Sequence, residues 1–385
     1  MKLIHTADLH LGKQLYGYNI LADQEFILHQ IAEITVREQA DGLIIAGDVF
    51  DTSVAGRSAV DLLKRFLTEL RDAGVTVFMI SGNHDSPERI HYGSSIMDSC
   101  GIYISGIYDG SRDIRIVDMH DAYGPLHICL LPYLDPASVR SSGRFGEEQI
   151  VTFDDAVAAV LAKLPCREDE RYIAVAHQFV TGLGTIPSSS ESERIIVGGI
   201  EQVDAERFTV FEYTALGHLH KPQKVGLPTI RYAGSPLKYS ASECGAAKSV
   251  TIIEVYEKGN VRIRQIPLKP LHDLRIICGT LDNLTGEGAV PAPHDDYFAV
   301  QLTDAIPPTD AMARLRAVYP NIVTLEMVVN NVLPAAAAAG ARMEDLRKSD
   351  RDLFAGFFAE TTGRELSAFQ EQTILEILQE MEAEK

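Results

Sequence analysis

The chain has 385 residues, of which 46% are hydrophobic and 23% are charged, and its formal net charge is −19 at pH 7. This length indicates two or three domains with a substantial hydrophobic core. No apolar run approaches the roughly 18 residues of a membrane-spanning helix, and the acidic balance counts mildly against tight binding of nucleic acid by this chain alone.

The cysteines and the first residues bear on the cellular compartment. The five cysteines form no CxxC pair; they are Cys100, Cys129, Cys166, Cys244 and Cys278. Their scatter argues against a zinc ribbon and against a disulfide framework, so we expect a reducing, cytoplasmic compartment. The apolar run from Leu3 leads directly to Asp8, a candidate functional residue, so we expect no signal peptide.

Strand and helix signals alternate over the first 270 residues. Ile20, Ile27 and Ile31 recur at helical spacing, and a second helical pattern stops at Gly74. We predict strands at 3–7, 42–46 and 75–80, helices at 20–39 and 60–70, and later strands at 126–131, 172–176, 213–216, 229–232, 250–255 and 261–267. The alternation predicts parallel strands with helices on the faces, and the closely spaced later strands predict a mixed sheet system.

The composition changes after Pro270. Strands are predicted at 272–281 and 297–302, a helix at 309–318 and a strand at 322–328, which together make a small ββαβ module. Pro334 and the alanines before Gly340 favour a linker or hinge. Residues 341–385 predict two helices whose apolar stripes are too large for so short a segment to bury. That favours binding in a partner's groove over folding back on the chain.

Polar side chains stand at the ends of five predicted strands. They are Asp8 and His10, Asp48, Asn83, His177, and the pair His218 and His220. Alternate residues of an extended segment share a face, so Asp8 and His10 can reach one ion. The Asp48 carboxylate can bridge two cations, and Asn83 offers a neutral oxygen. A ligand set this rich in nitrogen suits manganese, iron or zinc better than calcium or magnesium.

Two ions about 4 Å apart suit phosphodiester hydrolysis, because they polarise the phosphoryl oxygens and lower the pKa of a bridging water. His84 follows Asn83 directly, so we expect its side chain to point away from the ligand face and to donate a proton as a general acid. Asp51 and Asp85 are placed for hydrogen bonds to the ligand histidines or to His84.

Each motif also has a plainer interpretation. An isolated Asp-x-His arises by chance, the GHLH segment could be a turn with exposed histidines, and His177 alone would be a buried histidine with satisfied hydrogen bonds. The order of the motifs and their common place after apolar strands favour the two-metal hypothesis.

These motifs resemble those of the calcineurin-like metallophosphoesterases. The longer segments TADLHLGKQLYG, IIAGDVFDTS, ISGNHDSPER and GHLHKPQ, and the tail segment DLFAGFFAETTGRELS, resemble the SbcD family. Members of that family are nuclease subunits of bacterial SbcCD complexes and relatives of the eukaryotic and archaeal break-repair nucleases. The likeness covers essentially the whole chain. Thr52 stands where protein phosphatases of the superfamily usually carry arginine, which argues against that branch.

The resemblance implies an α/β fold, a calcineurin-like mixed β-sandwich flanked by helices, with a small α+β capping domain and C-terminal helices. It implies two manganese ions, one held by Asp8, His10, Asp48 and His220, the other by Asp48, Asn83, His177 and His218, with Asp48 bridging. It further implies His84 as the catalytic histidine of a 3′→5′ double-strand DNA exonuclease that is also an endonuclease on hairpins and single strands.

The resemblance also divides the chain. It implies a nuclease domain at 1–270, a DNA-binding cap at 271–332, and a linker with a helical segment at 333–385 that docks on the coiled coil of the ATPase SbcC. It implies a homodimer, a heterotetramer with SbcC, and a cytoplasmic protein without contact to a membrane. Two rival hypotheses stay open: a small-molecule phosphodiesterase with the same site, and a non-catalytic tether of DNA ends.

Overall fold

The computed structural model describes residues 1–108, 114–145, 150–193, 201–286 and 293–328, and in the tail residues 355, 356, 358, 366, 367 and 370–374. The chain divides into two compact units, Met1–Arg275 and Ile276–Lys385. Among the described residues, no helix has the length and apolar character needed to cross a membrane. The helices predicted for residues 341–385 fall almost entirely outside the described residues.

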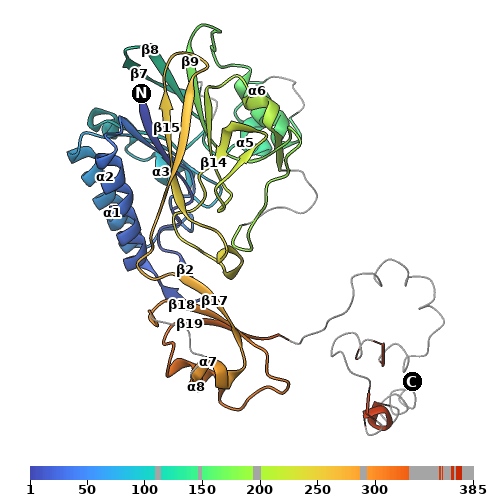
Figure 1. Ribbon diagram of the computed structural model, residues 1–385. Coiled ribbons are helices and arrows are strands. Elements are labelled where there is room, and N and C mark those ends of the chain that lie inside the picture. Colours follow the sequence, from blue (N-terminus) through green and yellow to red (C-terminus); the bar gives the residue numbers. More distant parts are fainter. Residues whose placement is uncertain are drawn as a thin grey trace, which may run out of the picture. The chain divides into compact units, whose positions relative to one another are not determined.

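The first unit is built on two six-stranded sheets (Figure 1). One has the order β16 (Val261–Pro267), β15 (Ser249–Val255), β1 (Lys2–Thr6), β4 (Gly42–Ala46), β5 (Thr76–Ile80) and β6 (Ile102–Ser105). The other has the order β13 (Gln223–Val225), β14 (Leu227–Tyr232), β12 (Tyr213–Gly217), β9 (Arg171–His177), β8 (Gly124–Leu130) and β7 (Arg115–Asp121). Each sheet mixes parallel with antiparallel pairs, which confirms the predicted mixed sandwich.

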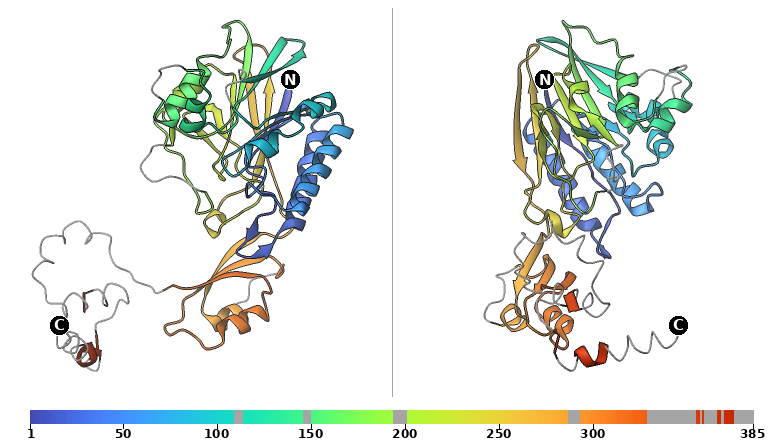
Figure 2. Two further views of the ribbon diagram at one scale, coloured as in Figure 1. Left: turned by 180° about the vertical axis from the view of Figure 1, so that it is seen from behind. Right: turned by 90° about the vertical axis from the view of Figure 1, so that its right-hand side faces the viewer.

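Helices flank this sandwich on both sides (Figures 1 and 2). On one side α1 (Leu21–Arg37) packs on α2 (Arg57–Asp72), which packs on β5; the short α3 (Pro87–His91) and α4 (Ser94–Met97) pack on β6. On the other side lie α5 (Pro136–Ser141) and α6 (Phe153–Leu161). Two small ribbons complete the unit, β2 (Gln14–Leu15) with β3 (Tyr18–Asn19), and β10 (Phe179–Thr181) with β11 (Gln202–Asp204).

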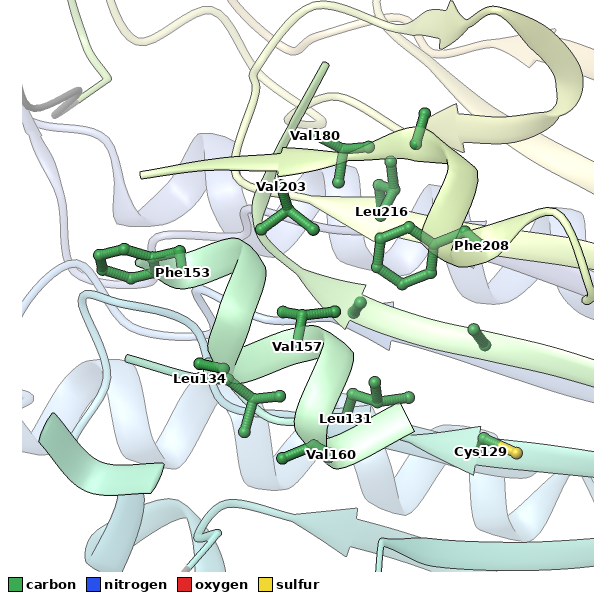
Figure 3. Close-up of a cluster of buried hydrophobic side chains, with 14 of the residues drawn as sticks. Cys129, Leu131, Leu134, Phe153, Val157, Val160, Val180, Val203, Phe208 and Leu216 are labelled. Carbon is green, nitrogen blue, oxygen red and sulfur yellow. The ribbon is translucent and has the colours of Figure 1, made fainter. Parts of the chain in front are cut away.

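Two apolar clusters hold these layers together. Between the sheets, Ile44 and Phe78 from one sheet pack in the same buried cluster as Ile173 from the other. A second cluster lies beneath α6, where Figure 3 shows Val157 and Val160 beside Leu131 and Leu134. Because both faces of the second sheet are covered, its central strand β9 is buried at every position. Strand β9, which ends at His177, is therefore packed on both faces.

Within residues 274–286 and 293–328, the structure holds a three-stranded sheet with two short helices. Its strands β17 (Leu274–Gly279), β18 (Tyr297–Leu302) and β19 (Ile322–Met327) are joined by α7 (Leu281–Thr285) and α8 (Ala311–Arg316). The predicted first strand at 272–281 was too long, and α7 was missed. Thr280 ends the strand because its hydroxyl accepts a hydrogen bond from the Asn283 N–H and caps the helix. The module is therefore βαβαβ rather than ββαβ.

Candidate two-metal centre

Three of the motifs meet at one edge of the first sheet. Strands β1, β4 and β5 are parallel neighbours, so their carboxyl ends lie together. Asp8 and Asp48 each stand two residues beyond a strand end, and Asn83 stands three beyond β5. The parallel pairing thus brings residues from three distant segments to one place.

The second sheet brings its histidines to the same edge. His177 is the last residue of β9, and it pairs with Gly217 at the end of β12, directly before His218. The His177 ring donates from Nδ1 to the Ala46 carbonyl oxygen at 2.8 Å. The His218 backbone N–H donates to Asp8 Oδ1 at 2.9 Å. These two bonds link the strand ends of one sheet to those of the other.

Two glycines make this approach possible. A Cβ atom on Gly217 would lie 1.8 Å from the Ala46 carbonyl oxygen, and one on Gly82 would lie 2.1 Å from Asp48 Oδ1. Both distances are far below van der Waals contact. The glycine that opens the GHLH motif and the one that opens GNHD are therefore steric requirements of the site.

Asp48 lies at the middle of the cluster. Its Oδ2 atom is 3.6 Å from His10 Nε2 and 3.3 Å from His177 Nε2, while its Oδ1 atom accepts a hydrogen bond from the His84 N–H at 2.9 Å. One carboxylate oxygen thus faces a histidine from each sheet. A carboxylate between two groups of ligand atoms suits a role as a ligand shared by two cations.

On one side of Asp48, the candidate ligand atoms of Asp8, His10 and His220 lie within 4.8 Å of one another. The Nε2 atoms of His10 and His220 are 3.1 Å apart. The Oδ2 atom of Asp8 is buried and has no hydrogen-bond partner among the described residues. A buried carboxylate oxygen beside two converging ring nitrogens fits a cation, because each needs a positive partner.

On the other side, Asn83 connects two histidines. Its Oδ1 atom is 3.0 Å from His177 Nε2 and 3.1 Å from His218 Nδ1. Asp8, Asp48 and His177 also form a group of candidate ligands within 4.8 Å. The structure therefore brings all seven predicted ligand residues into one cluster with two lobes that share Asp48.

The protonation states of His218 and His220 suit metal binding, whereas the charge of Asp48 outweighs burial and raises the pKa of His177 to about 9. Burial lowers the pKa of His218 to about 3 and that of His220 to about 4, with nearby histidine charges acting in the same direction. Both rings are therefore neutral near pH 7, as ligands must be. Burial alone would raise the pKa of Asp48, but the charge and hydrogen bond of His177 outweigh it and hold that pKa well below its usual range.

His84 does not point away from the cluster as expected. Its ring lies edge-on to the His10 ring with 4.8 Å between centroids, and a nitrogen of His84 belongs to a group of candidate ligand atoms with His10 and Asp48. Its Nδ1 lies 2.9 Å from the Asp51 carbonyl oxygen, which can only accept, so Nδ1 carries a proton. The ring is half-buried.

Asp51 and Asp85 support the cluster in different ways. Asp51 Oδ1 lies 3.4 Å from His10 Nδ1 and accepts a hydrogen bond from Lys13 Nζ at 2.8 Å. Asp85 was expected to bond to a histidine. Its carboxylate instead accepts hydrogen bonds from the N–H groups of Val49, Phe50 and Gly82, at 2.9–3.1 Å. It therefore fixes the loops that carry Asp48 and Asn83 through their backbones.

Two residues that hold the first motif were missed. Gln24 Nε2 donates to the His10 carbonyl oxygen at 2.8 Å, and the Tyr239 hydroxyl donates to the Leu9 carbonyl oxygen at 2.5 Å. A buried glutamine within the apolar pattern of α1 is a signal that could have indicated Gln24. Tyr239 lies 230 positions from Leu9 and carries no such signal.

Four of the predicted residues adopt left-handed backbone conformations. The φ angles are 54° at Asp8, 43° at His10, 47° at Asp48 and 100° at His218. Residues other than glycine seldom adopt positive φ, and clusters of such residues mark functional sites.

Comparisons with known proteins identify the family. The family model described as calcineurin-like phosphoesterase matches residues 1–222, and one described as type 5 capsule protein repressor C-terminal domain matches residues 270–362. The SbcD subunit of the nuclease SbcCD from Staphylococcus epidermidis is 32% identical over 382 residues, which cover 98% of each chain. The chain belongs to the SbcD family. As an SbcD-family member it is a metal-dependent hydrolase with the calcineurin-like fold, which confirms the resemblance read from the motifs.

Two solved structures are similar to the chain at lower identity. A dimetal phosphatase from Danio rerio is 14% identical and has a TM-score of 0.41, covering 70% of this chain and 98% of its own. A phosphopantetheinyl hydrolase from Mycobacterium tuberculosis is 18% identical and has a TM-score of 0.34, covering 61% of this chain and 90% of its own. These superpositions are too distant to bear on substrate or mechanism.

Proposed function

We propose that this SbcD-family chain is the nuclease subunit of a DNA repair and recombination complex and that it cleaves DNA with two manganese ions. The observation that carries the proposal is the position of Asp48 Oδ2, 3.6 Å from His10 Nε2 and 3.3 Å from His177 Nε2. A bridging carboxylate between two groups of N and O ligands is the arrangement that two-metal phosphodiester hydrolysis needs.

We assign the ligands to two positions. Asp8, His10, Asp48 and His220 would hold one ion, and Asp48, Asn83, His177 and His218 the other. The mixture of imidazole, carboxylate and amide donors suits manganese. When bound, the two ions would supply Lewis-acid activation of the phosphodiester.

The protein's own contribution to proton transfer is assigned to His84. The hydrogen bond from Nδ1 to the Asp51 carbonyl oxygen fixes the ring, which lies beside His10 and Asp48. When protonated, His84 has an N–H at Nε2 that can donate to the leaving oxygen. Asp85 keeps the flanking loops in register through its three backbone bonds.

The remaining parts of the proposal concern substrate and partners. We propose 3′→5′ exonuclease activity on double-stranded ends and endonuclease activity on hairpins and single strands. Residues 1–270 would form the nuclease domain, 271–332 a DNA-binding cap, and 333–385 the segment that docks on an SbcC-type ATPase. The active form would be a cytoplasmic homodimer in a heterotetramer with that ATPase. The basic DNA-binding surface of the ATPase would offset the net charge of −19 on this chain.

A nuclease assay tests the proposal. The purified full chain is incubated with blunt and hairpin DNA in manganese or in magnesium, with and without the ATPase partner and ATP. Cleavage of both substrates that needs manganese supports the proposal. Absence of cleavage by the full complex in manganese would refute it.

Two rival functions predict different results. A small-molecule phosphodiesterase would hydrolyse bis-p-nitrophenyl phosphate but leave hairpin DNA intact. A non-catalytic tether would bind DNA ends without hydrolysing either substrate. The complete ligand cluster favours catalysis over a tether, because a site kept only as a relic would not retain every donor at these distances.

A further inference from the structure

A buried ion pair lies behind His220, outside the predicted ligand set. Lys248 Nζ lies 2.5 Å from Glu243 Oε2, and the two residues are only 6% and 2% exposed. Such pairs contribute little net stability, because the loss of hydration offsets the attraction. Their position next to a candidate ligand suggests a role other than stability.

Lys248 holds the main chain of His220. Its ammonium donates to the His220 carbonyl oxygen at 2.8 Å, to Ser235 Oγ at 2.8 Å and to Glu243. An ammonium group has three protons, so these bonds use all of them. The lysine therefore has one fixed position and cannot supply a proton to the site.

Glu243 holds the ring of His220 through a serine. Ser192 Oγ is 2.6 Å from Glu243 Oε1 and 2.7 Å from His220 Nδ1. The ion-paired carboxylate can only accept, so the serine hydroxyl donates to it. Ser192 Oγ must then accept from His220 Nδ1–H. The hydrogen bonds therefore run from His220 Nδ1 through Ser192 Oγ to Glu243 Oε1, which places the ring proton on Nδ1.

The other polar groups of His220 are also held. Its backbone N–H donates to Glu193 Oε1 at 2.6 Å, and its Nε2 atom lies 3.1 Å from His10 Nε2. With N–H, carbonyl and Nδ1 all bonded, only the Nε2 lone pair is available, and it faces the lobe formed with Asp8 and His10. In His177, the Nδ1 atom is held instead by a hydrogen bond to the backbone carbonyl oxygen of Ala46.

We propose that Glu243, acting through Ser192 and anchored by Lys248, is a positioning residue that fixes the tautomer and direction of His220 and so sets the affinity of the metal position containing Asp8, His10 and His220. Hydrogen-bonded partners of this kind typically change metal affinity by about 10- to 100-fold. At the other metal position, His177 is held by the backbone carbonyl oxygen of Ala46, which a side-chain substitution does not remove. The metal affinities of the two positions should therefore differ in their sensitivity to substitution. The proposal rests on the two-metal function proposed above.

Manganese titration of the full-length chain tests this assignment. Binding is followed by isothermal titration calorimetry and by electron paramagnetic resonance of free Mn²⁺. In Ser192→Ala and Glu243→Gln we expect one of two ions to bind about 10- to 100-fold more weakly, with the second ion unchanged. Ser192→Thr keeps the hydroxyl and should restore the wild-type affinity. Ser189→Ala, in the same segment but exposed, serves as the matched control.

The outcomes separate this inference from the proposed function. Glu243→Gln leaves Lys248 buried without its partner and could unfold the chain, whereas Ser192→Ala leaves no buried charge and keeps the test decisive. Wild-type affinity for both ions in a folded Ser192→Ala variant would overturn the positioning role alone. Equal weakening of both ions would also overturn it. A wild-type chain that binds no pair of manganese ions would overturn the proposed function as well.

Discussion

At the scale of single residues, His84 is the side chain whose role is most directly testable. Its Nδ1 is committed to the Asp51 carbonyl oxygen, and no predicted ligand depends on its side chain for a hydrogen bond among the described contacts. His84→Gln should lower kcat on hairpin DNA at least about 100-fold, the usual contribution of a general acid, while both manganese ions remain bound. The exposed His120 gives the control His120→Gln. An unchanged kcat in His84→Gln would exclude the proton-donor role.

His5 makes the stability of the metal-free protein depend on pH. It is fully buried, its Nδ1 lies 3.0 Å from the Tyr213 hydroxyl, and burial together with the charge of Arg231 lowers its pKa to about 3. The unfolded value is about 6.5, so between these values only the unfolded chain binds the proton. Stability is therefore lost as the pH falls below about 6.5, by up to about 1.4 kcal/mol per pH unit.

Urea unfolding at pH 7 and pH 5 checks this expectation. His218 and His220 titrate in the same direction, so the comparison is between wild type and His5→Gln rather than between two pH values alone. The loss of unfolding free energy between pH 7 and pH 5 should be smaller in His5→Gln. Identical losses would show that His5 does not titrate on unfolding.

The residues of the site were predictable to different degrees. Asp8, Asp48 and Asn83 were identifiable because each follows an apolar strand, and parallel strands bring such positions to one edge. Tyr239 and Glu243 were not, because their contacts cross large sequence separations and depend on how loops return to the strand ends. The predicted direction of the His84 ring was wrong because the ring direction depends on the turn after β5, where side chains no longer alternate between faces.

At the scale of elements, α6 shows how a helix without a strong sequence signal forms. Thr152 accepts a hydrogen bond from the Asp155 N–H, and the Asp155 side chain accepts one from the Thr152 N–H, which completes a capping box. Phe153, Val157 and Val160 then bury one face of the helix. Its nine residues are too few for periodicity alone to predict it, whereas α1 and α2 were predicted from longer patterns.

Removing this cap should have a measurable cost. Thr152→Ala deletes the hydroxyl acceptor at the start of α6 and should lower the free energy of unfolding by about 1 kcal/mol. Thr68→Ala, at a partly buried position of α2, is the control. Within the part of the chain that the structure describes, its hydroxyl bonds only to the carbonyl oxygen of Lys64, and the change should stay within about 0.5 kcal/mol. Urea denaturation of both variants measures the difference, and equal effects would contradict the capping role.

At the scale of the whole molecule, one buried arginine joins the two sheets of the first unit. Arg171, which is 3% exposed, donates to both oxygens of Asp121 and to the Gly124 carbonyl oxygen in the second sheet, and to the Tyr256 carbonyl oxygen just beyond the first. A planar guanidinium can satisfy these diverging acceptors at once, whereas an ammonium cannot. The fold class was predictable from the motif order, but this tie was not, because nothing in the pattern around Arg171 marks it as buried.

Arg171→Met should therefore destabilise the protein strongly. Asp121 keeps the N-terminal ammonium at 2.8 Å as a second cationic partner, but the carbonyl oxygens of Gly124, Pro125 and Tyr256 lose this donor. Each buried acceptor left unsatisfied costs about 1–3 kcal/mol. Arg167→Met removes a nearby arginine whose side chain is 67% exposed, and it should cost less than about 1 kcal/mol. Thermal and urea unfolding of the two variants provide the comparison. If Arg171→Met lowers the free energy of unfolding no more than Arg167→Met does, Arg171 does not stabilise the contact between the two sheets.

The left-handed backbone at Asp8, His10, Asp48 and His218 has a consequence for directed evolution. Each such conformation costs a residue with a Cβ atom about 1–2 kcal/mol, a penalty that glycine does not incur. A screen of random variants that rewards heat resistance without assaying cleavage should therefore enrich glycine at these four positions. Thermostabilised libraries of this protein must be selected for activity in the same round, because the substitutions that relax the backbone are those that remove the ligands.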